Sequence, residues 1–372
     1  MARFARSSGA AGAFGSLLAL SIAHAAGCGE GSVGGDPGDV GVGDDTGAIG
    51  PDVGRPGEGG VPGEGGLDAA SDAAVDTADA APVCSTPLPG VRAHYVDASK
   101  GRDTNDGLTA DTAWATIAKV DTELADGGSV APGEQVLFAR GQSFHGALRV
   151  PRPGTDTART TLGAYGCGAA PVISGLVALT GWKDVGSGVW EASCATCGPV
   201  LNVVVVDDES RGMGRFPNVD ATKRGYLTIE SHTDVGAGID PTITDSHLAG
   251  GIDWTGAQIV VRKQAWILDR GVIKAHSGAT LTYESPTGGP LIDGFGFFIQ
   301  NDRRTLDQLG EWFYDPTTHV VSMFFGAAGP GSHRVAASDV DRLVDLTGKG
   351  GVTLRELSLR GANEHAVELT YA

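Results

Sequence analysis

Beyond Cys84 the chain is a succession of short runs rich in β-branched and aromatic residues, and each run is ended by glycine, proline or aspartate. Among these runs are EQVLFAR, NVVVVDD, AQIVVRKQAWIL, GFFIQN and EWFYDPTTHVVSMFF. Runs of this composition between turn residues are typical of β-strands. Residues 84–372 are therefore predicted to form an all-β domain.

Segment 113–125 is the one part of this domain with clear helical spacing, because its apolar residues recur at intervals of three and four. Asp111 and Thr112 precede it as possible N-caps. The open end of a stack of β coils needs a covering element with one apolar face, and this helix fits that role. The spacing is set by Trp114, Ile117, Val120 and Leu124.

The C-terminal part of the chain contains a possible repeat. The runs LVDL, at 343–346, and AVEL, at 366–369, lie 23 residues apart. Between them, residues 352–359 (VTLRELSL) alternate apolar and polar, so one face of a strand could be buried. A spacing of this size indicates one coil of a solenoid. A β-sandwich is the alternative that would produce the same local pattern.

Residues 1–28 have the features of an export signal, with Arg3 and Arg6 before a mostly apolar stretch that ends LLALSIAHAAGCG. The motif AHA fits an ordinary signal peptidase, whereas AAGC resembles a bacterial lipobox in which Cys28 is lipidated. Lipidation would leave an even number of cysteines for an oxidising compartment. This parity favours a lipoprotein of the outer membrane or cell surface over a secreted protein.

Residues 29–83 contain no aromatic residue, and their twelve acidic residues face a single base, Arg55. Such a segment cannot build a core and is predicted to be a disordered tether. Without the signal and the tether, residues 84–372 still carry a net charge of −9. This charge argues against a nucleic-acid partner and gives no general attraction for polyanions.

The remaining cysteines are disulfide candidates. Cys194 and Cys197 have the spacing of a redox motif, but they follow a strand-like run in a chain predicted to be exported. A local disulfide between them, or pairing with Cys84 and Cys167, is the expected use. The sequence leaves the connectivity open.

The stretch HYVDASKGRDTNDGLTADTAWATIAKV, residues 94–120, resembles the opening of right-handed parallel β-helix proteins of the pectate-lyase-like superfamily. GEQVLFARGQSFHGAL, GAYGCGAAPVISG, GRFPN and LDQLGEWFYDPTTHVVSMFF resemble carbohydrate-active members that carry an inserted β domain. The resemblance implies a right-handed parallel β-helix over 84–372, with an N-terminal capping helix and an inserted β-rich region at about residues 176–336.

The resemblance also implies an extracellular polysaccharide as the ligand, held in a groove along the helix. An enzyme of this kind would be a polysaccharide lyase or a glycoside hydrolase, and the alternative is a non-catalytic glycan-binding or adhesin-like scaffold. The acidic charge of the domain favours a neutral glycan, or an acidic one bridged by calcium. Calcium is thus the one cofactor that this interpretation includes.

The run GANEHAVEL contains the most reactive cluster of side chains. Asn363, Glu364 and His365 lie at a bend where members of the superfamily often gather calcium ligands and acid/base groups. Glu364 and His365 are therefore candidate catalytic residues and Asn363 a candidate substrate ligand, with a solvated turn as the alternative. The chain stops in a strand-like run without a terminal cap, so further C-terminal coils are predicted to be missing.

The motif GRFPN offers Arg215 and Asn218 next to a very apolar strand. In the family this region lies close to the substrate groove, which makes Arg215 a candidate catalytic residue and both side chains candidate substrate ligands. The planar guanidinium of Arg215 could hold a sugar hydroxyl or carboxylate. The alternative is an arginine that pins a loop through backbone carbonyls, with Pro217 fixing the backbone.

Asp103, Asn105 and Asp106 offer oxygen atoms suited to calcium, but their spacing lacks the full pattern of a calcium-binding loop. Aspartate, asparagine and glycine also form turns by bonding to their own backbone. A turn between the first strand and the helix is therefore the preferred interpretation, with metal binding as the alternative.

Overall fold

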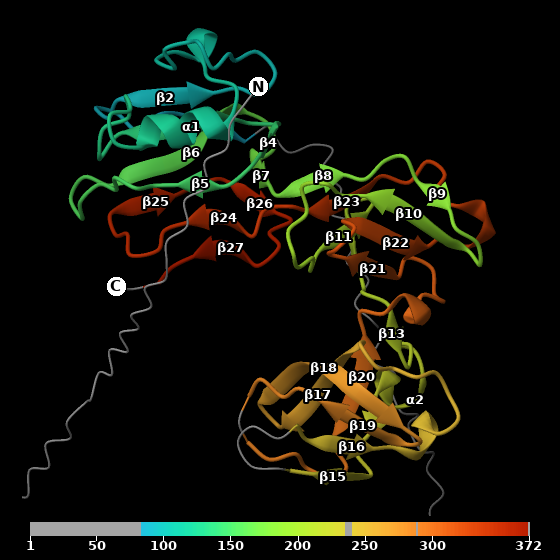
Figure 1. Ribbon diagram of the computed structural model, residues 1–372. Coiled ribbons are helices and arrows are strands. Elements are labelled where there is room, and N and C mark those ends of the chain that lie inside the picture. Colours follow the sequence, from blue (N-terminus) through green and yellow to red (C-terminus); the bar gives the residue numbers. More distant parts are fainter. Residues whose placement is uncertain (1–82, 235–239, 288, 371–372) are drawn as a thin grey trace, which may run out of the picture. The chain divides into compact units, whose positions relative to one another are not determined.

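The computed structural model describes residues 83–234, 240–287 and 289–370 (Figure 1). The export signal, Cys28 and the predicted tether up to residue 82 lie outside these residues. Strands dominate the described part, whose only α-helices are α1 (Ile117–Leu124) and α2 (Thr222–Gly225). The prediction of an all-β domain is confirmed. No helix in this part of the chain is long and apolar enough to cross a membrane.

Three sheets contain parallel strand pairs, and the chain visits these sheets in a repeating order. The first pairs β2 (Ala93–Val96), β3 (Gln135–Ala139), β6 (Thr160–Cys167) and β25 (Val352–Leu354). The second pairs β4 (Ser143–His145), β7 (Val172–Ser174) and β26 (Ser358–Arg360). The third pairs β5 (Leu148–Arg149), β24 (Arg342–Asp345) and β27 (His365–Glu368). From β3 the chain passes through β4 and β5 before it returns to the first sheet at β6.

Successive visits to one sheet stack in register. Val344 of β24 pairs with Val367 of β27, 23 residues later, so the two runs predicted to repeat are neighbouring strands. Segment 352–359, expected to be one strand, instead divides into β25 and β26. The chain bends between them at Glu356, whose φ is 57°.

The interior side chains of these sheets form one apolar core. Phe138 and Phe144 pack edge to face, with ring centroids 5.0 Å apart. Burying one such side chain stabilises a fold by about 1.5–3 kcal/mol. The helix α1 adds its own apolar face to this core. The core includes Ile117, Val120, Leu124, Leu148, Leu162, Ile173, Leu343 and Val344.

The helix is shorter than predicted, because Trp114 is in extended backbone and α1 begins only after its N-cap Thr116. The Trp114 N–H donates to the carbonyl of Tyr95 over 2.9 Å, which adds Trp114 to the edge of β2. Its indole is buried under the preceding loop, where Gly107 has φ 72° and a Cβ would lie 2.4 Å from the ring. Backbone pairing has therefore overridden the helical spacing of this residue.

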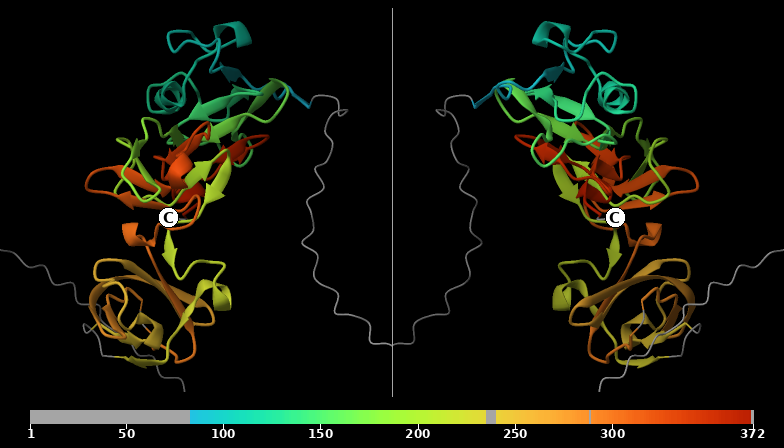
Figure 2. Two further views of the ribbon diagram at one scale, coloured as in Figure 1. Left: turned by 90° about the vertical axis from the view of Figure 1, so that its right-hand side faces the viewer. Right: turned by 90° about the vertical axis from the view of Figure 1, so that its left-hand side faces the viewer.

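The strands between β7 and β24 pair antiparallel and surround two further apolar cores. The first group comprises β8 (Leu176–Ala178), β9 (Lys183–Asp184), β10 (Val189–Ser193), β11 (Val204–Val206), β12 (Glu209–Arg211), β21 (Trp312–Asp315), β22 (Val320–Phe324) and β23 (Val335–Ser338). The second comprises β13 (Arg215–Phe216), β14 (Leu227–Thr228), β15 (Ser231–Thr233), β16 (Thr242–Thr244), β17 (Gln258–Gln264), β18 (Ile267–Ser277), β19 (Thr280–Tyr283) and β20 (Gly296–Gln300). Figure 2 shows the second group, yellow to orange, curled around its interior.

Two disulfides are formed, and they resolve the connectivity that the sequence left open. Cys84 of β1 (Cys84–Ser85) is bonded to Cys167, directly opposite it on β6. Cys194 is bonded to Cys197. The prediction that these four cysteines form disulfides is confirmed.

The loop before α1 depends on Asp103, and its loss should destabilise the domain. One carboxylate oxygen accepts the N–H groups of Ala115 and Thr116 over 2.8 and 3.1 Å, and the other accepts the Thr116 hydroxyl over 2.7 Å. Asp103→Ala should lower the free energy of unfolding by about 1–2 kcal/mol, measured by urea denaturation. Asp111→Ala removes an equally charged, exposed carboxylate of the same loop. This variant should change the free energy of unfolding by less than about 0.5 kcal/mol. Equal effects of the two variants would contradict this role for Asp103.

Candidate functional site

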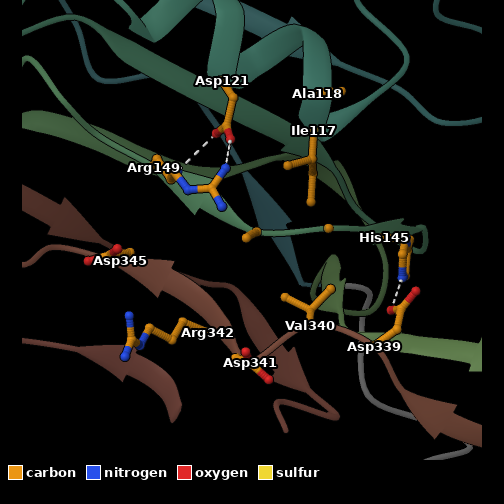
Figure 3. Close-up of a pocket in the computed structure, with 12 residues that line it drawn as sticks. Ile117, Ala118, Asp121, His145, Arg149, Asp339, Val340, Asp341, Arg342 and Asp345 are labelled. Carbon is orange, nitrogen blue, oxygen red and sulfur yellow. Dashed lines mark hydrogen bonds and ion pairs between the residues drawn. The ribbon is translucent and has the colours of Figure 1, made fainter. Parts of the chain in front are cut away.

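A cavity of about 600 Å³ lies between α1 and the strands β5 and β24 (Figure 3). We call it the α1 cavity. Its lining is rich in charged side chains that come from three separate stretches of the chain. These side chains are Asp121, His145, Arg149, Asp339, Asp341, Arg342 and Asp345.

His145 and Asp339 form a close pair at one side of the α1 cavity (Figure 3). The imidazole Nε2 lies 2.7 Å from the Asp339 Oδ1. The aspartate side chain is 7% exposed and the histidine side chain 47% exposed, so the carboxylate is fixed while the ring remains accessible. A carboxylate that orients an accessible imidazole is an arrangement able to accept or deliver a proton.

Asp121 and Arg149 form a second pair, which ties α1 to β5. The Asp121 Oδ1 accepts the backbone N–H of Arg149 over 2.9 Å, and its Oδ2 lies 3.5 Å from the guanidinium. Burial raises the pKa of Asp121, and the hydrogen bond and charge of Arg149 only partly offset it. The contacts of this pair indicate a structural role at the edge of the cavity.

A second cavity, of about 560 Å³, contains the cluster predicted from the run GANEHAVEL. We call it the arginine cavity. Asn363, Glu364 and His365 line it together with side chains from the two antiparallel groups. Those side chains are Asn202, Arg211, Met213, Arg270, Gln300 and Trp312.

Asn363 is 6% exposed and fully engaged, so it is not a free substrate ligand. Its amide nitrogen donates to the Val200 carbonyl and to the Asp341 Oδ1, each over 2.9 Å. Its amide oxygen accepts the N–H of Asn202 over 2.8 Å. Asn363 thereby fastens the Asp341 carboxylate to the chain segment at 200–202.

Asp341 and Glu364 are neighbours, and each directly precedes one of the adjacent parallel strands β24 and β27. Arg342 pairs with His365 in the register of β24 and β27, and the Asp341 carbonyl accepts the N–H groups of Glu364 and His365 over 2.9 Å each. Neighbouring strands lie about 4.8 Å apart. Both residues are exposed. Asp341 lines the α1 cavity and Glu364 lines the arginine cavity, and the Asn363 amide of the arginine cavity bonds to the Asp341 carboxylate.

Arg342 follows Asp341 and connects the acids of β27. Its guanidinium lies 3.7 Å from the Glu364 carboxylate and also contacts Glu368. His365 is exposed, and its Nδ1 lies 3.8 Å from the Glu368 carboxylate, which is an ion-pair distance and too long for a hydrogen bond. The structure thus brings Asn363, Glu364 and His365 together with Asp341 and Arg342.

Arg215 and Asn218 lie apart from this group of residues. The Arg215 side chain donates to the carbonyls of Pro217 and Gly225, and its guanidinium lies 3.7 Å from the centre of the Phe298 ring. Burial lowers the pKa of Arg215 against the opposing charges of Tyr226 and Glu311. Asn218 donates to Asp307 over 2.9 Å. These contacts match the alternative in which Arg215 pins a loop.

The polar side chains of the predicted turn, Asp103, Asn105 and Asp106, likewise bond to the protein. Besides the contacts of Asp103, Asp106 accepts the Leu108 N–H and the Thr112 hydroxyl, and the Asn105 amide donates to the Ala113 carbonyl. These bonds match the turn interpretation. Elsewhere in the described residues, Glu230, Asp245 and His247 form a group. Their ligand atoms lie close enough together to hold a metal ion.

The sequence interpretation missed Asp341, His145 and the arginines of the second cavity. A signal for Asp341 was present, because it precedes Glu364 by the same 23 residues that separate the two predicted repeats. No such signal existed for Arg211 and Arg270, which reach the cavity only through the folding of the antiparallel segments.

No family model matches the chain, and no curated protein matches it. Among solved structures, one described as a glycoside hydrolase aligns with 73% of this chain and 51% of its own, at a TM-score of 0.55 and 16% identity. The complex of XylC with xylose aligns over 73% and 36% at a TM-score of 0.39 and 13% identity. GH136 lacto-N-biosidase from Eubacterium ramulus aligns over 24% and 14% at a TM-score of 0.20 and 32% identity.

The first of these likenesses defines the fold class. This chain is an all-β protein that shares its fold with a glycoside hydrolase, and it spans about half the length of that protein. At 16% identity the likeness concerns the fold alone, so any activity must be argued from this chain's own residues.

Removal of the Asn363 amide should weaken the whole region around Asp341. Asn363→Ala removes the three hydrogen bonds that this buried side chain makes to residues 200, 202 and 341. At about 1 kcal/mol for each bond, it should lower the free energy of unfolding by about 2–3 kcal/mol in urea titrations. Asn218→Ala removes one exposed hydrogen bond from the side-chain amide to Asp307. The free energy of unfolding should fall by less than about 1 kcal/mol. An Asn363→Ala variant as stable as wild type would refute the role of Asn363 in holding Asp341 to segment 200–202.

Proposed function

We propose that the protein is an exported glycoside hydrolase that cleaves an extracellular glycan, with Asp341 and Glu364 as its pair of reacting carboxylates. The observation that carries the proposal is the position of these two exposed acids, each directly before one of two adjacent parallel strands and joined through the backbone. Most glycoside hydrolases cleave the glycosidic bond with a pair of carboxyl groups at a defined separation.

The proposal includes the right-handed parallel β-helix predicted from the sequence. In it, β3, β4 and β5 form one coil, β6 and β7 begin the next, and β24 to β27 continue it after the antiparallel insertion. The cyclic strand order and the 23-residue register between β24 and β27 support this proposal. Stacked coils place equivalent residues of consecutive repeats in a row, and this stacking accounts for the pairing of Asp341 with Glu364.

The spacing of the two acids favours the retaining reaction. Backbones one strand spacing apart, about 4.8 Å, allow their side-chain carboxyl groups to approach the separation of about 5–5.5 Å found in retaining enzymes. The hydrogen bond from Asn363 occupies the Asp341 Oδ1 and leaves Oδ2 to attack the anomeric carbon.

In the first step, a bond forms between the Asp341 Oδ2 and the anomeric carbon while the bond to the leaving oxygen breaks. Glu364 gives its proton to that oxygen. In the second step, Glu364 takes a proton from water, the resulting oxygen attacks the anomeric carbon, and the bond to Asp341 breaks. Asn363 holds the attacking carboxylate in place throughout.

A polysaccharide lyase is the second candidate, and the pair His145 and Asp339 favours it. An accessible imidazole oriented by a fixed carboxylate could remove the proton next to a uronate carboxyl group, with Arg149 or Arg342 of the same cavity facing the negative charge. The two candidates differ in products, because a lyase creates an unsaturated sugar and a hydrolase does not.

The hydrolase proposal predicts loss of turnover in Glu364→Gln and Asp341→Asn by about 10²–10⁴-fold, measured as release of reducing ends from a panel of polysaccharides and aryl glycosides. Added azide should restore turnover in Asp341→Gly and yield a glycosyl azide of inverted configuration. Asp315→Asn alters a turn carboxylate outside both cavities and should retain full activity.

Three outcomes would overturn the hydrolase. Undiminished turnover in both Glu364→Gln and Asp341→Asn would exclude these two acids as the reacting carboxylates. Ultraviolet absorbance from unsaturated products that is lost in His145→Gln would establish the lyase. Glycan binding by the full chain without any turnover would indicate the non-catalytic scaffold.

Export and lipid anchoring at Cys28 are part of the same proposal, and the two disulfides support an oxidising compartment. Cys28→Ser should move the full chain from the membrane fraction to the soluble fraction of expressing bacteria, whereas Ser32→Ala in the tether should leave it at the membrane. A Cys28→Ser chain that remains in the membrane fraction would contradict the anchor.

A further inference from the structure

The arginine cavity collects positive charge in a domain whose net charge is negative. Arg211 of β12, Arg270 of β18 and His365 of β27 reach it from three different sheets, and Glu364 is its acidic side chain. Charges farther away than about 8 Å are largely screened at physiological ionic strength, so the acidic surface of the domain does not determine what binds here.

Arg211 is incompletely paired. One terminal nitrogen of its guanidinium lies 3.0 Å from the exposed Glu209 carboxylate. Its Nε is buried and has no hydrogen-bond partner among the described residues. A buried N–H without a partner carries a free-energy cost, so the protein leaves part of the hydrogen-bonding capacity of Arg211 unused.

Arg270 is exposed, and its side chain makes no hydrogen bond or ion pair with the residues that the structure describes. Its backbone is held by pairing with Val260 of β17, and β18 pairs with β19 from Ile273 onward. The neighbours Asp269 and Gly271 are buried on the opposite face of the strand. The guanidinium is therefore carried on a rigid element and is available to a ligand.

The neutral donors of the arginine cavity are already engaged by the protein. The Gln300 amide donates to Gln258, the Asn202 amide to the Asn363 carbonyl, and the Trp312 indole to the Arg211 carbonyl. Arg211 donates one side-chain hydrogen bond, to Glu209, and the side chains of Arg270 and His365 donate none to the described residues. A ligand with a carboxylate matches this set, because a guanidinium binds carboxylate oxygens through two parallel hydrogen bonds.

We infer that the arginine cavity binds the carboxylate of an acidic sugar, such as a hexuronate, in the glycan. This inference rests on the proposed function, since Glu364 lines the same cavity and the bound sugar would lie beside the bond to be cleaved. It also reverses the expectation of a neutral or calcium-bridged glycan that the overall charge favoured.

Direct binding tests the inference without any need for turnover. The probes are D-glucuronate and D-galacturonate, each compared with its uncharged methyl ester by ligand-observed NMR titration of the full chain. At least one acid should bind about tenfold more tightly than its ester, because a charge-assisted hydrogen bond is stronger than a neutral one. This preference should weaken as salt is added.

Arg270→Gln and Arg211→Gln should each abolish the preference for the acid over the ester, whereas Arg270→Lys should retain part of it. Arg262→Gln removes the same charge from the neighbouring strand β17 outside the cavity and should leave the preference unchanged. Equal affinities for acid and ester in wild type, or an undiminished preference in Arg270→Gln, would overturn the inference.

Glu364→Gln separates this inference from the proposed function. The variant should keep the preference for the acid while it loses turnover. A wild-type chain that binds the acid but cleaves nothing would refute the hydrolase and leave the acidic-sugar site standing. A chain that cleaves neutral glycans and shows no preference for the acid would support the hydrolase and refute the acidic-sugar site.

Discussion

The parallel pairing of β24 with β27 is the constraint on which the candidate site depends. It sets residue 341 beside residue 364 and residue 342 beside residue 365, with the backbone hydrogen bonds of the Asp341 carbonyl closing the pair. The spacing of strands therefore fixes the separation of the backbones that carry the two acids. A shift of the register by one residue would turn alternate side chains toward the core and dismantle the arrangement.

Asn363 shows how the antiparallel insertion is tied to the parallel sheets. Its single amide group bonds to a carbonyl at Val200, to an N–H at Asn202 and to the Asp341 carboxylate. A buried amide with all its bonds made is rigid, because loss of any one partner leaves a polar group without water. The proposed attacking carboxylate is thus positioned by a residue that need not touch a sugar.

The contrast between the acidic domain and the arginine cavity illustrates the short range of electrostatics in salt. The net charge of −9 on residues 84–372 describes the average surface. Within a cavity, the few charges nearest to the ligand dominate the interaction. Arg211 and Arg270 therefore matter more for binding than the many exposed carboxylates elsewhere.

The sequence by itself determined the all-β class, the pairing of LVDL with AVEL and the cluster at 363–365, because alternation and repeat spacing are local properties of the chain. It did not determine the start of α1, since the backbone pairing of Trp114 with Tyr95 is a tertiary contact that overrides helical spacing. Only the folded structure brought Arg211 and Arg270 to the residues of β27, because they come from strands about 150 and about 100 positions earlier in the chain. Local patterns record which face of a strand is buried, whereas the set of side chains that line a cavity depends on how distant strands pack.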